Sequence, residues 1–303
     1  MPDLDYPALR ALAAIVQTGS FERAARLLHV TPSAVSQRIR QLEERWGTVL
    51  VVRGNPCTAT EAGAWLCRHV ENVGILEEEL LAHLPGLGAR EEPEQRVTLH
   101  IATNADSLGS WFLGAIAAFS RSSRYLVSVA VDDEDHTADW LEAGRVIAAV
   151  TSSATSVPGC RRIALGTMRY HAVASPDYRD RHFAGEVSAE AIGRAPALTF
   201  NQKDRLQHRW LLKALGREVA HPTHWLPSTQ GFLDATLAGM GWSLNPALLV
   251  RHPLADGRLV ELKPGVTLDV PLYWQINRLA AERLTGLTRA VVDTARSLLV
   301  PAA

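Results

Sequence analysis

Apolar residues near the N-terminus recur at helical spacing in two short consecutive segments. Within residues 5–18, Leu9, Leu12 and Val16 follow one another at intervals of three and four, which is the period of a helix with one buried face. The second segment begins at Ser20, whose hydroxyl can accept a hydrogen bond from a free amide of the first turn. The pattern therefore predicts two helices separated by a short break.

A third helix is predicted after a tight turn at His29-Val30. Thr31 offers a capping oxygen, and Pro32 stands at a position where a missing N–H costs no helical hydrogen bond. Two short helices joined by such a turn form a helix-turn-helix, and the outer face of its second helix can enter a major groove. Polar residues on an isolated helix are usually only solvated, but this context favours DNA reading. The residues of this face and of the helix start are Thr31, Pro32, Ser33, Ser36, Gln37, Arg38 and Arg40.

The next segments predict a β-hairpin and a long helix. Residues 49–60 have the composition of a small hairpin wing, which would bring Arg53 near a DNA phosphate. From Glu61 to Leu84 there is no proline, and apolar residues, among them Val73 and Leu80, recur every three or four positions. Such a stripe is explained by pairing with a second copy of the helix, so we expect dimers.

The rest of the chain alternates between strand and helix patterns. This alternation indicates an α/β region with mainly parallel sheets, in which ligands bind at the C-terminal ends of strands. The predicted strands are 97–103, 127–131, 146–151, 197–200 and 242–244, and the predicted helices are 107–119, 138–143 and 207–215.

Composition narrows the class of protein. A length of 303 residues predicts two or three cores. Hydrophobic residues make up 47%, and no apolar run approaches the ~20 residues that span a bilayer. The N-terminus does not read as an export signal, so we expect a soluble, cytoplasmic protein without a membrane partner. The net charge is only −1, but residues 18–68 contain seven arginines and four glutamates, which favours contact with phosphates.

Candidate metal and catalytic motifs are weak. The acidic run 132–135 with His136 is interpreted as a solvated loop first, as the rim of a cation-binding pocket second, and as a metal site last. His221 and His224 flank Pro222, which argues against a helical metal pair. The three cysteines lack zinc or disulfide spacing. No nucleophile or phosphate-loop motif is present, so we predict neither an enzyme nor a cofactor.

The helix-turn-helix region resembles the LysR-type transcriptional regulators. The similarity runs from Gly19 to Glu43 and continues through Gly47, Leu50, Arg53, Thr60 and Gly63. Further segments resemble the branch of this family formed by the ArgP and LysG regulators of basic amino-acid export. They are Asn104–Leu108, Val131–Glu134, Pro158–Cys160 and Leu272–Trp274.

The resemblance implies an architecture and a set of partners. The expected α/β fold has an N-terminal winged helix-turn-helix (1–60), a linker helix for dimerisation with a hinge (61–90) and a periplasmic-binding-protein-like sensor (91–303). In the sensor, subdomain I would comprise 97–168 and 272–303 and subdomain II 169–268, joined by two strands that cross near 168–172 and 270–274. The implied partners are double-stranded promoter DNA, a basic amino acid, a second copy in a homodimer or a homotetrameric dimer of dimers, and RNA polymerase.

The resemblance also predicts where the effector binds. A strand end would deliver Asn104, Asp106 and Ser107 to a helix start, where free amides favour a carboxylate and Asp106 accepts the α-ammonium; a purely capping role for Asp106 is the alternative. Carboxylates would face the side-chain cation, and two hydroxyls would complete the cleft from the other side. These residues are Asp133, Glu134, Asp204, Ser228 and Thr229. Two positions depart from the expected pattern: Gln37 stands where many relatives carry arginine, and Lys203 brings a cation near the pocket.

Three other functions compete with a sensor-controlled regulator. A nucleoid-type DNA-binding protein would use the α/β region only for assembly, and binding of an amino acid to that region would count against it. A periplasmic amino-acid receptor is disfavoured by the fused helix-turn-helix and by the N-terminus. An enzyme fused to a DNA-binding domain lacks a catalytic motif.

Overall fold

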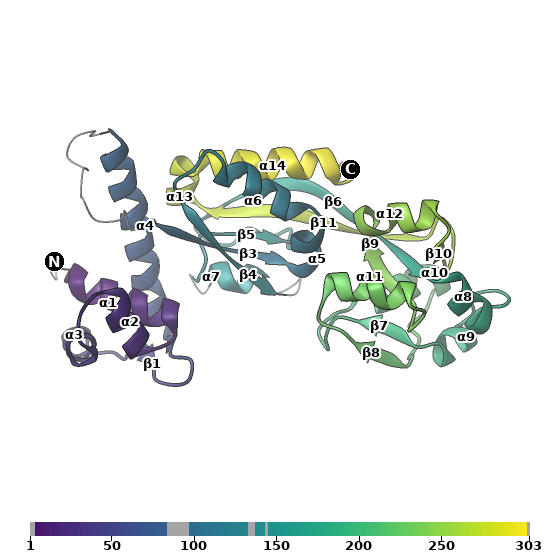
Figure 1. Ribbon diagram of the computed structural model, residues 1–303, viewed down its shortest axis with the longest axis horizontal. Helices are drawn as coiled ribbons and strands as arrows, with labels where there is room; N and C mark the ends of the chain where they lie inside the picture. Colours follow the sequence, from purple (N-terminus) through teal and green to yellow (C-terminus); the bar gives the residue numbers. More distant parts are fainter. Residues whose placement is uncertain (1–3, 84–96, 133–136, 143–144, 302–303) are drawn as a thin grey trace.

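A computed structural model describes residues 4–83, 97–132, 137–142 and 145–301 (Figure 1). Three helices open the chain: α1 (Tyr6–Thr18), α2 (Phe21–Leu27) and α3 (Pro32–Trp46). Ser20 and Thr31 cap α2 and α3, as predicted. Each side-chain oxygen accepts a hydrogen bond from an amide in the first turn, so both helix starts are determined by local sequence.

The N-terminal core differs slightly from the predicted stripe. Leu9 and Leu12 of α1 are fully buried, but Val16 is only half-buried and Ile15 takes its place in the core. The small α2 residues Ala24 and Ala25 allow close packing against the other two helices. The opposite face of α3 completes this core, with Val35, Ile39 and Leu42 buried.

The hairpin and the long helix form as predicted. Strand β1 (Val51–Val52) pairs antiparallel with β2 (Thr58–Ala59). Helix α4 (Glu61–His83) follows at once and lies between the N-terminal helices and the rest of the chain (Figure 1). No helix among the described residues is both long enough and apolar enough to cross a bilayer.

The second part of the molecule is built on one sheet of seven strands. Their order is β10-β6-β11-β5-β3-β4, and β9 also pairs with β6. Strands β3, β4 and β5 are mutually parallel where they pair, and the other pairs are antiparallel. The bounds are β3 (Thr98–Asn104), β4 (Leu126–Asp132), β5 (Ala148–Thr151), β6 (Cys160–Ala174), β9 (Ser243–Pro246), β10 (Val260–Glu261) and β11 (Thr267–Asn277).

We call the part built on β3, β4 and β5 the first lobe. Its helices α6, α13 and α14 lie on one side of the sheet and α7 lies on the other (Figure 1). The predicted helix 107–119 is interrupted by a π-helical turn, a feature often found beside functional sites. The helices are α5 (Ala105–Ser107), η1 (Leu108–Phe112), α6 (Leu113–Ser120), α7 (Thr137–Glu142), α13 (Arg278–Arg283) and α14 (Thr285–Leu298).

The second lobe is built around β9, β10 and a small parallel pair, β7 with β8. The glycine-rich segment before β9 forms a tight turn between a helix and a strand, with Gly239 in the left-handed region at a φ of 72°. The remaining elements are β7 (Ala197–Thr199), β8 (Thr223–Trp225), α8 (Pro176–His182), α9 (Ala189–Arg194), α10 (Leu206–Leu215), α11 (Thr229–Leu237) and α12 (Ala247–Ala255).

Strands β6 and β11 run through both lobes as one antiparallel ribbon. They pair from Thr267 with His171 to Asn277 with Cys160, and the register shifts between Leu272 and Tyr273. The ribbon is longer than the two predicted crossings because each strand continues into both lobes. One hydrophobic core extends along it through the two lobes.

Helix α4 packs on the first lobe through a face other than its predicted stripe. Ile75 is 1% exposed and joins the core of the lobe, whereas Leu80 on the stripe is 59% exposed. Beside Ile75, the Glu71 carboxylate lies 3.8 Å from Nε2 of His100 on β3. Burial raises the pKa of Glu71 to about 8 and lowers the pKa of His100. Both groups are therefore mainly neutral at neutral pH, and this contact is not an ion pair.

Candidate functional site

The outer face of α3 is polar and accessible. Ser33, Gln37 and Arg40 are exposed, while Ser36 and Arg38 are half-buried. These residues follow Thr31 and Pro32, which are exposed at the helix start. The Thr31 hydroxyl accepts a hydrogen bond from the Ala34 amide at 3.2 Å and lies 3.0 Å from Ser33 Oγ. The helix thus presents side chains able to contact base edges.

Two arginines on this surface have neighbours within the domain. The Arg53 guanidinium, directly after β1, lies 5.4 Å from the centre of the Phe21 ring. Arg40 is 3.6 Å from Glu44 one turn along α3, and both side chains are largely solvated. An exposed pair of this kind is weak, so Arg40 can exchange its partner for a phosphate or a base at little cost.

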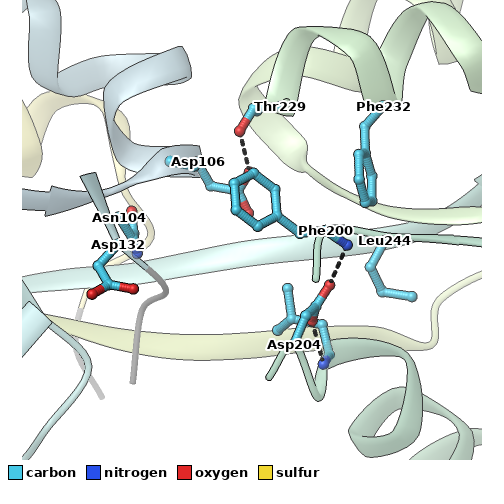
Figure 2. Close-up of a pocket in the computed structure, with 10 residues that line it drawn as sticks. Asn104, Asp106, Asp132, Phe200, Asp204, Thr229, Phe232 and Leu244 are labelled. Atoms are coloured by element: carbon cyan, nitrogen blue, oxygen red, sulfur yellow. Dashed lines mark hydrogen bonds between the residues drawn. The ribbon is translucent and has the colours of Figure 1, made fainter. Parts of the chain in front are cut away.

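A pocket lies between the two lobes, where the C-terminal ends of β3 and β4 meet the second lobe (Figure 2). Its volume is about 440 Å³, including space open to solvent. It is lined by Asn104, Ala105, Asp106, Asp132, Phe200, Asp204, Leu206, Thr229, Phe232 and Leu244. Four of the eight predicted effector residues are among these: Asn104, Asp106, Asp204 and Thr229.

The first lobe contributes a helix start. Asn104, the last residue of β3, caps the following helix: its Oδ1 accepts a hydrogen bond from the Ser107 amide at 2.7 Å. Asn104 therefore performs the capping role that was the alternative for Asp106. Asn104 Nδ2 and Ser107 Oγ are both buried, and neither has a hydrogen-bond partner among the residues that the structure describes. Two buried polar groups without partners are costly unless a ligand or water satisfies them.

The second lobe contributes the start of α11. The Thr229 hydroxyl donates a hydrogen bond of 2.9 Å to Oδ1 of Asp106, joining the lobes across the pocket (Figure 2). Ser228 is the N-cap of α11, and its hydroxyl accepts from the Gly231 amide at 3.1 Å. Ser228 is absent from the lining, so the structure brings only one of the two predicted hydroxyl residues to the pocket.

The acidic residues occupy different positions. Asp204 lines the pocket, but its two carboxylate oxygens accept backbone amides of Phe200 and Leu206. Asp132, at the end of β4, also lines it, and the Trp140 indole donates to its Oδ2 at 3.0 Å. The predicted residues Asp133 and Glu134 lie outside the described residues.

Lys203 does not form an ion pair with Asp204 in the described part of the chain. Its side chain is exposed, and its backbone amide donates to Asn201 Oδ1 at 2.7 Å. The pocket lining therefore includes three carboxylates, while Lys203 is not part of it.

Sequence reasoning missed the apolar part of the lining. Phe200, Phe232 and Leu244 resemble ordinary core residues in the sequence, because aromatic and aliphatic side chains near strands usually pack inside. The available signal was the position of Phe200 at the end of a predicted strand, since pockets in α/β folds form at strand ends. Asp132 was noted only as the first residue of an acidic run.

Two family models together match most of the chain. The bacterial regulatory helix-turn-helix protein model of the lysR family matches residues 7–64, and the LysR substrate binding domain matches residues 92–299. The regulator ArgP of Pseudomonas aeruginosa is 44% identical over 296 residues, which cover 98% of this chain and 97% of that protein.

Solved structures are similar over nearly the whole chain. The crystal structure of ArgP from Mycobacterium tuberculosis is 43% identical, covers 99% of this chain and 100% of its own, and has a TM-score of 0.81. Full-length LysG from Corynebacterium glutamicum with bound effector Arg is 36% identical, covers 98% of this chain and 100% of its own, and has a TM-score of 0.72.

Proposed function

The chain belongs to the LysR family of DNA-binding transcription regulators, and on that premise we propose that it senses a basic amino acid, lysine or arginine, between its two lobes. Binding would change how its dimers contact promoter DNA and thereby control amino-acid export genes. The observation that carries this proposal is the pocket, where three carboxylates meet a helix start at the joint of the lobes. The LysG structure solved with arginine supports the same chemistry.

The polar groups suit both ends of such a ligand. The side-chain amide of Asn104 and the hydroxyl of Ser107, which have no hydrogen-bond partner among the described residues, can hold the α-carboxylate next to the first turn of α5. Asp106 and Asp132 can accept ammonium or guanidinium protons, since burying a cation without a carboxylate is costly. Because Asp106 also contacts Thr229, a ligand at Asp106 acts on both lobes at once.

DNA is bound through α3 and the wing. In this proposal Ser33, Ser36 and Gln37 read base edges, whereas Arg53 contacts a phosphate. We assign residues 1–60 to a DNA-binding domain, residues 61–90 to a dimerisation helix and hinge, and residues 91–303 to an effector-binding domain. Pairing through α4 gives a dimer, a dimer of dimers occupies the promoter, and RNA polymerase is a further partner there.

A thermal-shift screen of the twenty amino acids tests the effector. A ligand at 100 times its dissociation constant stabilises the folded protein by about 2.7 kcal/mol, so a binder should raise the unfolding temperature. We expect arginine and lysine to raise the unfolding temperature more than the uncharged amino acids do. If no amino acid shifted the transition and operator binding were insensitive to all of them, the sensor function would be refuted and an assembly role favoured.

A further inference from the structure

Phe200 presents an aromatic ring to the pocket from the second lobe. The ring is half-buried, packs on a cluster that contains Phe232, and points toward the end of the pocket where Asp106 lies (Figure 2). The face of an aromatic ring carries negative partial charge and attracts cations. Phe200 therefore adds an aromatic surface to a pocket lined by carboxylates, and this combination suits a cation with a flat face.

A local network fixes the position of Phe200. Asp204 Oδ2 accepts a hydrogen bond from the Phe200 amide at 3.1 Å, and Oδ1 accepts one from the Leu206 amide at 2.9 Å. Asn201 closes the same turn by accepting the amide of Lys203 at 2.7 Å. Asp204 is 8% exposed, so it holds these bonds largely away from water. The turn can place the ring without help from a ligand.

We propose that Phe200 sets the preference of the pocket among basic amino acids by stacking on the guanidinium of arginine, so that arginine binds more tightly than lysine. This inference rests on the proposed function, because it requires a basic amino acid in this pocket. A guanidinium is planar and weakly hydrated and stacks on aromatic rings, whereas an ammonium is compact and strongly hydrated. Asp204 acts through Phe200 and is a positioning residue.

Calorimetric titration of the full-length protein with L-arginine and L-lysine tests the proposal. The wild-type protein should bind arginine more tightly. Phe200→Leu should weaken arginine binding about tenfold or more and lysine binding by less, so the ratio of the two affinities falls toward one. Phe200→Tyr keeps a ring and should keep the ratio. Leu226→Val, in the same cluster but absent from the pocket lining, is the matched control and should also keep it.

The ratio of the arginine affinity to the lysine affinity distinguishes a loss of selectivity from a loss of the folded structure. Asp204→Asn should lower the ratio as Phe200→Leu does, whereas simple loss of fold lowers both affinities alike. Phe200→Met, which keeps an apolar side chain of similar size, serves if the leucine variant folds poorly. A wild-type preference for lysine, or an unchanged ratio in folded Phe200→Leu and Phe200→Met, overturns the inference. Absence of binding of either amino acid to the wild-type protein instead refutes the proposed function.

Discussion

Thr229 on α11 donates a hydrogen bond of 2.9 Å to Asp106 on α5, so one contact spans the pocket and ties the two lobes together. Its partners come from separate helix starts, and neither helix is capped by the residue that makes this contact. The carboxylate at position 106 is therefore not needed to begin a helix.

Asp106→Ala should cut the affinity for arginine and lysine by about tenfold to a hundredfold, since a lost hydrogen bond to a charged group costs about 1.5–3 kcal/mol. The unfolding temperature without ligand should fall only moderately, because the helix keeps its Asn104 cap and the loss is confined to the hydrogen bond from Thr229. Isothermal titration calorimetry and a melting curve measure the two quantities. Asp234→Ala, an exposed change on α11, is the control. Unchanged affinity in folded Asp106→Ala would remove this residue from the effector site.

The DNA face should divide into two kinds of residue. Gln37→Ala should cost about 1–3 kcal/mol on the operator and relax preference at one base pair, whereas Arg53→Ala should weaken operator and random DNA alike. Titrations of both DNAs over a range of salt concentrations distinguish them. Arg121→Ala, after α6 in the first lobe, should change neither. If Gln37→Ala bound the operator and random DNA each as tightly as the wild type does, the docking of α3 would be contradicted.

The exposed stripe of α4 should hold the dimer. Leu80→Glu places a charge where a 59% exposed leucine is expected to meet its copy, so sedimentation should show monomers and operator affinity should collapse. A charge at Val73 should act the same way. Val52→Glu on the wing should impair DNA binding alone and leave the dimer intact. A wild-type chain that sediments as a monomer at micromolar concentration would disprove the pairing.

Glu71 should make stability fall as pH rises. Burial raises its pKa from 4.5 to about 8, so the unfolded chain ionises first. The contribution of Glu71 to stability is therefore greatest below about pH 4.5, declines as pH rises and becomes constant above the folded pKa. Glu71→Gln should be more stable than wild type at pH 8, and the difference should shrink toward pH 4.5. Melting curves across this range measure it. Glu77→Gln, an exposed change on α4, should retain the wild-type profile.

The N-terminal fold could be predicted because its determinants are local. Ser20 and Thr31 lie within three residues of the amides they cap, and the buried stripe of α3 repeats within a single helix. Such features are visible in any short window of sequence.

The ribbon and the full pocket depend on contacts between distant segments. Met168 pairs with Val270, and no local pattern specifies that register. In the sequence Phe200 resembles a core residue, because its place in the pocket depends on the distant elements α11 and β3. Glu71 reads as part of the solvated face of a helix, because the sequence does not reveal that α4 also packs on β3.

The ribbon of β6 and β11 determines how the lobes can move. Because both strands continue from one lobe into the other, the joint is a paired β-ribbon, and we expect it to resist bending more than two loose linkers would. The irregularity in the ribbon has a fixed place: the register shifts at Leu272 and Tyr273, opposite Gly166, whose φ is 131° and where a Cβ would lie 2.7 Å from the carbonyl oxygen of Val300. Paired strands resist sliding. We therefore expect the lobes to rotate relative to one another through small angles at this point, and a signal from the pocket to pass along the ribbon as a twist.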